Sequence, residues 1–589
     1  MRHALTDAVP SIQRAGNGAW VRCLCCVLAF CVPHEVLAQT QVDKADAQRQ
    51  IESLQRQEQE RLQRDQETKH PRTERVDGMD TAPLLPKITV PALGAKCLDI
   101  AEIRIQGATL LANGERARLG SLFAGRCLAV SDIEALLGEV TKYYIDRGYI
   151  TTRAYLPQQD LTQGRLLVLV VEGVVEKVVI EDGDSHSVSL LNTFPGVAGG
   201  VLNLRDLEQG IDQINRLTSN SAELEIQPGD VAGASRVAVR NQARLPWHFN
   251  IATDNQGADS TGATQVAIGG TVDNLLGFNE MLSLNHREST PNDPKRQYAG
   301  SDVLNLSIPY GYNTWSFGSS QSKYASVIRV PSGLELVSDG YSKTDNLRLD
   351  RVVYRDQFNR ATLSATVTTK ESKNYLDGQF LGVSSRSLTV LDVDSSLNTR
   401  FAGGQLTLDF GYAQGVDAMG AMRDMDNLPD WAARAQFNKT KLGFNFVRPF
   451  RVADTDFSFS TQLSSQKAHV TLYGSEQISI GGLYSVRGFV RNSLSGDEGY
   501  YWRNEFAMRQ PLRIGDETVS IRYYVGYDSG EVKNLTAHIP EGQLTGMVLG
   551  MSAQWQGINW DFFHTRPLSG PDGMSLESGQ TWFRVSYSF

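Results

Sequence analysis

The 589-residue sequence lacks long apolar runs. Its longest, "CLCCVLAFCV" at 23–32, holds about ten residues, whereas a membrane-spanning helix needs roughly 20. That length excludes a helical membrane span here and is typical of the apolar region of a secretory signal peptide. Arg14 and Arg22 precede the run and "EVLAQ" follows it. We therefore expect a signal peptide over residues 1–38, with Gln39 as the first mature residue. A buried core helix is the alternative.

The sequence also lacks an excess of positive charge. Lys and Arg together number 57, Asp and Glu 66, and the net charge is -9. A protein that binds nucleic acid by neutralising phosphates needs the opposite balance, so no nucleic-acid partner is expected. The nucleotide-binding pattern G-x-x-x-x-G-K-[ST] and the hydrolase patterns H-E-x-x-H and G-x-S-x-G do not occur, and the nine histidines are scattered. We therefore expect no catalytic site, no cofactor and no metal.

Cysteine is scarce, with six residues, four of which lie within the N-terminal apolar run. Cys97 and Cys127 are the two that remain after removal of a signal peptide. A metal site would need more ligands, and an isolated pair in an exported protein favours a disulfide. Two buried thiols are the alternative.

The start of the mature chain is polar and poor in glycine. Residues 41–67 are rich in Gln, Arg and Glu, contain neither Gly nor Pro, and repeat opposite charges four residues apart. This pattern predicts a helix within 39–69. Its apolar stripe is too thin to pack on a core, so the helix is either a solvated linker or sits in a polar cavity. Residues 70–92 contain four prolines and predict an extended linker.

Two similar stretches follow, 93–172 and 173–243, and each combines short strands with an amphipathic helix. In the first, Ser131 and Glu134 predict a capping box at the start of the helix, and Gly148 predicts its end. Two tandem modules of one kind indicate a binding array. A single mixed domain is the alternative.

From 244 to 589 the apolar residues alternate with polar ones, as in "VSIRYYVGYD". Alternation kept up over more than 300 residues, with aromatic residues at strand ends, is typical of a transmembrane β-barrel. A soluble β-sandwich would also alternate, but not for so long. About sixteen such segments can be counted, an even number as bacterial barrels require, and sixteen strands enclose a water-filled lumen.

One gap between the predicted strands, residues 467–499, is too long for a turn and contains "YSVRGFV". Strand parity places it on the side opposite both termini. On the thirteenth predicted strand, Asp528 has the same lumen-facing parity as Tyr524. An arginine inside a confined pore would gain from a bidentate carboxylate partner, so Arg487 and Asp528 are candidates for a pair. A solvated surface loop is the alternative.

At these residues the chain resembles the TpsB transporters of two-partner secretion systems, which are relatives of the barrel-assembly insertase. The motifs that carry the resemblance are Val486-Arg487-Gly488-Phe489 at a loop tip, "GYDSG" on the thirteenth strand, "GVLNLRDLEQGIDQINRL", "DNQGADSTG" and "VDNLLGFNE". The resemblance implies a mainly β fold: a 16-stranded transmembrane antiparallel β-barrel, preceded by an N-terminal helix and two periplasmic α+β POTRA domains.

The resemblance also implies roles for particular residues. The loop tip would fold back into the barrel lumen, where Arg487 meets Asp528, and residues 39–69 would plug the pore. Tyr587 and Phe589, on one face of the last strand, would serve as the signal for the barrel-assembly machinery.

The function that the resemblance implies is secretion of one large exoprotein, such as an adhesin, a haemolysin or a contact-dependent toxin. The POTRA domains would recognise that partner in the periplasm, and the barrel would sit among the lipids of the bacterial outer membrane. A passive porin would lack the tandem modules and the plug. An insertase for barrel proteins is the closer alternative, although insertases usually carry more POTRA domains.

Overall fold

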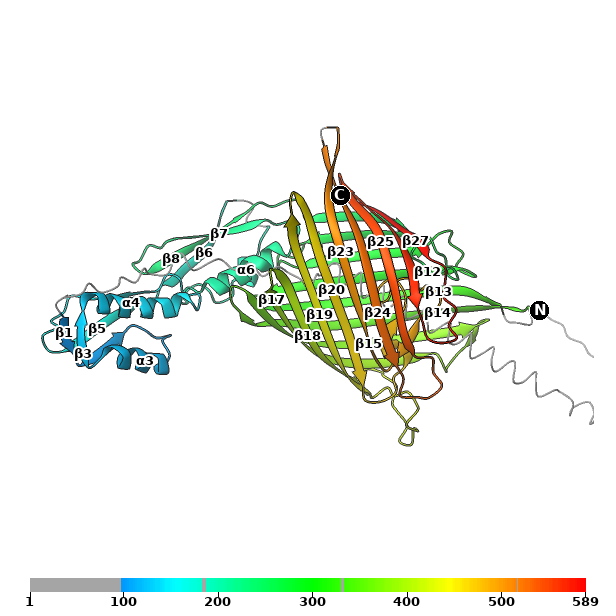
Figure 1. The fold of residues 1–589 in the computed structure, drawn as a ribbon, viewed down its shortest axis with the longest axis horizontal. Coiled ribbons are helices and arrows are strands. Elements are labelled where there is room, and N and C mark those ends of the chain that lie inside the picture. Colours follow the sequence, from blue (N-terminus) through cyan, green and yellow to red (C-terminus); the bar gives the residue numbers. More distant parts are fainter. Residues whose placement is uncertain (1–96, 183–186, 330–332, 516) are drawn as a thin grey trace, which may run out of the picture.

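The computed structural model describes residues 97–182, 187–329, 333–515 and 517–589. Two small modules lie at one end of an elongated molecule and a β-barrel forms the rest (Figure 1). Within the described ranges, no helix is both long enough and apolar enough to cross a membrane. Three predictions fall outside the described residues: the signal peptide (1–38), the plug helix (39–69) and the linker (70–92).

The first module packs two helices against one face of a small sheet. The sheet has the strand order β2-β5-β4, and β1 pairs separately with β3. Leu136 and Val140 of α4 lie fully buried against alternate residues of β5, as the helical and strand periodicities require. The elements are β1 (Cys97–Ile100), β2 (Glu102–Gln106), α3 (Asn113–Phe123), β3 (Arg126–Ala129), α4 (Val130–Ile145), β4 (Arg153–Tyr155) and β5 (Arg165–Val171).

The prediction of a capping box from Ser131 and Glu134 is wrong. The helix begins at Val130, and the backbone N–H of Ala129 donates to the carboxylate of Asp132 at 2.8 Å. The strand β3 runs directly into the helix, so the first turn starts earlier than the Ser-x-x-Glu pattern indicates. An acidic residue in that turn also interacts favourably with the helix dipole.

The second module repeats this plan with the strand order β6-β8-β7 and one long helix. Its elements are β6 (Val174–Asp182), α5 (Leu190–Thr193), α6 (Leu204–Asn215), β7 (Ala222–Pro228) and β8 (Ala234–Asn241). The side chain of Asn203 accepts the backbone N–H of Arg205 at 2.9 Å and caps α6. Leu207 and Ile214 of α6 lie buried against β8, which closes the core of the module.

Sixteen antiparallel strands close the barrel, because the last strand, β27, pairs with the first, β9. The predicted fold class is therefore confirmed. A two-residue strand, β16 (Gln379–Phe380), extends one hairpin without adding to the ring. The barrel strands are β9 (Trp247–Asp254), β10 (Gln265–Asp273), β11 (Met281–Ser289), β12 (Tyr298–Tyr310), β13 (Asn313–Arg329), β14 (Glu335–Arg355), β15 (Asn359–Leu376), β17 (Arg386–Phe401), β18 (Gly404–Val416), β19 (Asn438–Val452), β20 (Thr455–Ala468), β23 (Glu498–Ile514), β24 (Glu517–Lys533), β25 (Gly542–Trp555), β26 (Ile558–Ser569) and β27 (Gln580–Ser588).

The two ends of the barrel differ in the length of their connections. Most strands are joined by tight turns at the end that faces the two modules, for example at 402–403 and 453–454, and the longer connection there is 274–280. At the far end the connections are longer and include 417–437 and 469–497. The second of these, which we call loop 6, starts two residues later and ends two residues earlier than the predicted 467–499. The two residues at each end of the predicted range belong to the strands β20 and β23.

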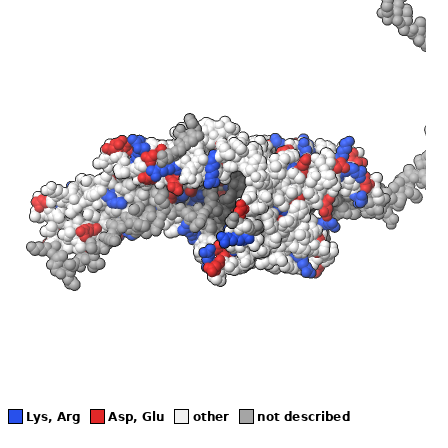
Figure 2. Space-filling view, turned by 90° about the horizontal axis from the view of Figure 1, so that it is seen from above, with Lys and Arg blue, Asp and Glu red and all other residues white. Residues whose placement is uncertain are grey.

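The outer surface of the barrel is apolar. Leucines, valines and aromatic residues at alternate positions of the strands stay exposed, among them Phe410, Val525 and Leu549. In Figure 2, charged side chains gather on the modules and toward the far end of the barrel, with a mainly uncharged band between them. Such a band matches the hydrocarbon layer of a membrane.

Candidate functional site

Loop 6 folds back into the barrel and brings its tip to the lumen wall. Two short strands, β21 (Ile478–Ile480) and β22 (Leu494–Gly496), pair with each other and form the stem of the loop. The tip between them carries the Val486 to Phe489 motif. Arg487 is only 5% exposed although it belongs to a loop, because the strands of the barrel surround it.

The structure brings Arg487 and Asp528 together. The Arg487 Nε atom lies 2.6 Å from one carboxylate oxygen of Asp528, and Nη2 lies 2.8 Å from the other. The backbone N–H of Arg487 also donates to this carboxylate, at 3.1 Å. A second acid, Glu505 on β23, accepts Nη1 at 2.9 Å and also contacts Arg522. Two acids on neighbouring strands therefore hold one arginine, and Asp528 is fully buried.

The tip fits against the wall because glycines leave room for its backbone. Gly488 has a φ of +116°, and a Cβ there would lie 2.5 Å from the carbonyl carbon of Arg566. A Cβ on Gly546 of β25 would lie 1.8 Å from the carbonyl oxygen of Arg487. A side chain at either position would push the tip off the wall.

Apolar side chains on either side of Arg487 seal the contact. Val486 and Phe489 are buried in a cluster that joins the loop to the strands. The other buried members of this cluster are Ile480, Leu494, Val532 and Leu544. The tip thus combines a buried ion pair with apolar packing, and Arg487 is kept away from water that would weaken its electrostatic contacts.

The base of loop 6 is fixed by a second buried acid. Glu476 lies 2.6 Å from the Nζ atom of Lys370 on β15 and 3.0 Å from that of Lys439 on β19. Asp497, at the other end of the loop, accepts the backbone N–H groups of Leu472 and Leu535. Contacts at both ends of the loop therefore support the pair at the tip.

Reasoning from the sequence missed Glu505, Glu476 and Lys439. A signal existed for Glu505, because it has lumen-facing parity between the outward-facing residues Asn504 and Phe506 of an otherwise alternating strand. No comparable signal existed for Glu476, because its two lysine partners come from strands far away in the sequence.

A different contact fixes the second module to the near rim of the barrel. Arg355, at the end of β14, lies 2.6 Å from Asp212 and 3.4 Å from Glu208, both on α6. Glu208 also lies 2.6 Å from Arg205, and the side chain of Arg355 is only 3% exposed. In the β12–β13 turn, the carbonyl of Gly311 accepts amide N–H groups from α6. The second module is thereby held beside the entrance of the lumen.

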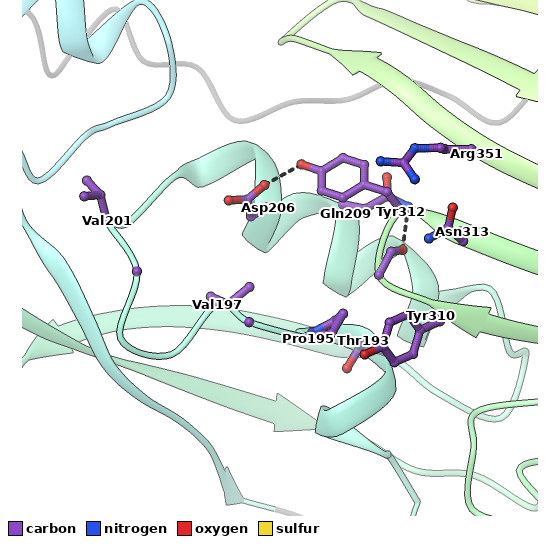
Figure 3. Close-up of a pocket in the computed structure, with 13 residues that line it drawn as sticks. Thr193, Pro195, Val197, Val201, Asp206, Gln209, Tyr310, Tyr312, Asn313 and Arg351 are labelled. Atoms are coloured by element: carbon purple, nitrogen blue, oxygen red, sulfur yellow. Dashed lines mark hydrogen bonds between the residues drawn. The ribbon is translucent and has the colours of Figure 1, made fainter. Parts of the chain in front are cut away.

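A pocket of about 310 Å³ lies next to this contact, between α6 and the β12–β13 turn (Figure 3). The Tyr312 hydroxyl donates to Asp206 at 2.6 Å across it. Burial raises the pKa of Asp206, although the hydrogen bond from Tyr312 opposes the shift. Asp206 therefore binds a proton more readily in the folded protein than in the unfolded chain, and the penalty of burying its charge is relieved as the pH falls toward the raised pKa.

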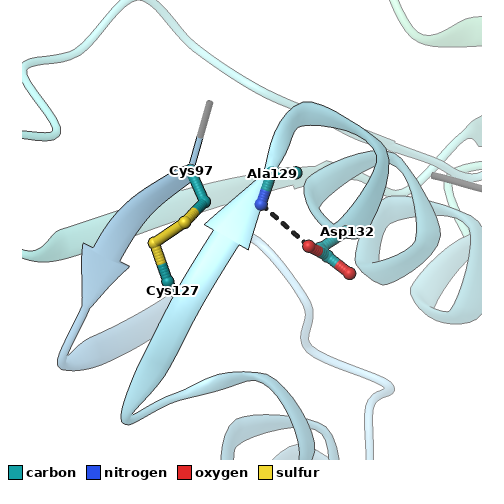
Figure 4. Close-up of a disulfide and its surroundings, with 4 residues drawn as sticks. All are labelled: Cys97, Cys127, Ala129 and Asp132. Carbon is teal, nitrogen blue, oxygen red and sulfur yellow. Dashed lines mark hydrogen bonds between the residues drawn. A yellow bond between two sulfur atoms is a disulfide. The ribbon is translucent and has the colours of Figure 1, made fainter. Parts of the chain in front are cut away.

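The remaining predicted site residues lie at the two ends of the described chain. Cys97 and Cys127 form a disulfide that joins β1 to β3, with their Cα atoms 5.3 Å apart (Figure 4). Tyr587 and Phe589 are about half exposed on the outer face of the barrel, and the Phe589 ring stacks on Phe249. Among the described residues, no group of His, Cys, Asp and Glu side chains could hold a metal ion.

Family models match most of the described chain. Residues 233–553 match the haemolysin secretion/activation protein ShlB/FhaC/HecB model. Residues 98–173 match a POTRA domain of the ShlB type, and residues 174–228 match a second POTRA domain. The first and second modules are therefore the two POTRA domains.

Individual relatives agree with the family models. The outer membrane transporter CdiB of Dickeya dadantii is 33% identical over 85% of this chain and 88% of its own. The hemolysin transporter protein ShlB of Serratia marcescens is 34% identical over 76% of this chain and 78% of its own. The solved structure of CdiB from Escherichia coli superposes with a TM-score of 0.81 at 30% identity, and covers 93% of this chain and 98% of that one.

Proposed function

The chain belongs to the ShlB/FhaC/HecB family of haemolysin secretion and activation proteins, and from that membership we propose that it secretes one large exoprotein. It is an outer-membrane transporter of the two-partner type, with its POTRA domains in the periplasm. The cargo would be an adhesin, a haemolysin or a contact-dependent toxin. The observation that carries the proposal is the loop 6 tip, seated inside a closed barrel whose near rim holds POTRA domains.

Recognition of the cargo would take place in the periplasm. Each POTRA sheet has edge strands to which an extended segment of the exoprotein could add by backbone hydrogen bonds. The helix residues Leu136 and Ile211 are weaker contact candidates, because Leu136 is buried in the first domain core and Ile211 packs, partly buried, against the second. Docking of α6 on the barrel rim would keep the captured segment close to the lumen.

Loop 6 would close the resting pore from the far side. The pairing of Arg487 with Asp528 and Glu505 would hold the tip across the lumen until the exoprotein displaces it. Residues 39–69 would plug the same lumen from the periplasmic side and leave it during transport. The linker at 70–92 would give that segment the reach to move.

The transport cycle would need no bound nucleotide and no catalysis. The sequence has no nucleotide-binding loop, and folding of the exoprotein outside the cell would supply the direction of movement. The partners would be the exoprotein, the lipids of the outer membrane and, during biogenesis, the barrel-assembly machinery acting on Tyr587 and Phe589.

A secretion assay tests the proposal. Cells with the wild-type protein should release the large exoprotein encoded beside its gene into the medium. Cells with Arg487→Ala should assemble the barrel, seen as a heat-modifiable band in gels, but release much less exoprotein. If wild-type cells release none, and other outer-membrane barrels fail to assemble when the protein is removed, the protein is an insertase instead.

A further inference from the structure

Three consecutive backbone N–H groups of loop 6 converge on one carboxylate. The N–H groups of Val490, Arg491 and Asn492 lie 3.1, 3.0 and 2.9 Å from the Oε1 atom of Glu577. Glu577 belongs to loop 8, residues 570–579, which joins β26 to β27. Successive N–H groups that point at one spot form a concave site for an anion, and here the anion is a side chain of the same protein.

Two side-chain contacts add to this attachment. The amide of Asn492 donates to the carbonyl of Ser575, also in loop 8, at 2.9 Å. The guanidinium of Arg491 lies 2.9 Å from Asp259 in the connection between β9 and β10. Arg491 and Asp259 are both well exposed, so this ion pair contributes little, and Glu577 provides the main attachment.

The attachment lies directly beside the loop tip. Residues 490–492 follow Phe489, and Arg487 is only three residues before Val490. Because Gly488 provides the sharp turn between them, a shift of 490–492 away from loop 8 would pull Arg487 along the lumen wall. The bidentate geometry on Asp528 tolerates little displacement.

We propose that Glu577 is a positioning residue for the loop 6 gate, which it holds from loop 8 while Asp528 and Glu505 hold it from the barrel wall. Opening the pore then requires the release of two clamps, one on the barrel wall and one on loop 8. This inference rests on the proposed role of loop 6 as the gate.

The test measures pore opening and loop protection in the purified full-length protein without cargo. Glu577→Ala removes the acceptor, and Glu577→Gln keeps one oxygen that can accept a hydrogen bond. Asp572→Ala is the matched control, because it removes an exposed acid from the same loop. Planar-bilayer recordings give the open probability, and hydrogen exchange followed by mass spectrometry reports on the amides of residues 490–492.

Glu577→Ala should raise the open probability roughly tenfold, because hydrogen bonds to a charged group are lost, and should speed exchange at 490–492. Glu577→Gln should fall between Glu577→Ala and the wild type, and Asp572→Ala should match the wild type. Faster exchange with an unchanged open probability would reduce Glu577 to a structural contact and overturn the proposal.

Arg487→Ala, recorded in parallel, separates this proposal from the one on which it rests. If Arg487→Ala opens the pore and Glu577→Ala does not, the clamp is refuted while the gate stands. If neither variant opens the pore, loop 6 is not the gate and both proposals fall. A wild-type protein that secretes no exoprotein contradicts the transport function itself, whatever the recordings show.

Discussion

At the scale of single residues, Arg487 is a buried charge at the tip of loop 6 that is held by two acids of the barrel wall. It is buried, and it binds Asp528 with two guanidinium nitrogens and Glu505 with a third. Breaking a buried ion pair by removing one partner costs about 3–5 kcal/mol, because the other charge stays buried and uncompensated. Removal of Arg487 or Asp528 should therefore move the loop tip away from the lumen wall, because a tip that stayed in place would bury an unpaired charge.

Exchanging the two charges tests whether this contact acts in transport. Arg487→Asp and Asp528→Arg should each abolish most secretion of the exoprotein. The double variant should recover only part of it, because the aspartate introduced at position 487 would face Glu505. Secretion is measured from the medium, with the amount of assembled barrel as the control. A double variant no better than either single one would mean that the contact itself does not matter.

At the scale of elements, helix α6 serves two purposes. Its apolar face completes the core of the second POTRA domain, and its charged face docks on the barrel. The first residue of α6 also contacts the first POTRA domain, because the backbone N–H of Leu204 donates to the carbonyl of Gly148 at 2.8 Å. One helix therefore contacts all three parts of the described molecule.

Removal of Arg355 should loosen this arrangement. Arg355→Ala removes the shortest contact between Asp212 and the barrel, together with the contact to Glu208, and should weaken docking by about 3 kcal/mol. Faster hydrogen exchange in α6 is the expected result, with the barrel unchanged. Arg451→Ala is a control, since Arg451 is an exposed arginine at the same rim of the barrel, where it pairs with Asp456 of the next strand. Equal exchange in both variants would contradict a role for the Arg355 contacts.

At the scale of the whole molecule, two separate segments are proposed to close one pore. Loop 6 occupies the lumen from the far end, and we predict that residues 39–69 enter it from the periplasm. If they do, deletion of 41–67 should increase the conductance of the purified protein in bilayers while the loop 6 contacts persist. A circular dichroism spectrum typical of a β-barrel verifies folding. An unchanged conductance would contradict the plug.

The sequence alone determined the features that depend on local pattern. Alternation of apolar and polar residues has the period of a strand, so it predicted the sixteen strands and the antiparallel barrel. Strand parity also pointed Asp528 into the lumen, where Arg487 meets it. Helix periodicity predicted the α+β modules. The predicted start of α4 at Ser131 was wrong, because β3 leads directly into the helix at Val130.

Only the tertiary structure decided which distant groups meet. Glu476 is charged in a loop, as many surface acids are, and nothing near it in the sequence specifies Lys370 and Lys439. The partners of Glu577 are backbone N–H groups, which every residue but proline carries and which therefore leave no mark in the sequence. Local patterns fix strands and their faces, whereas contacts between loops depend on how the closed barrel brings their ends together.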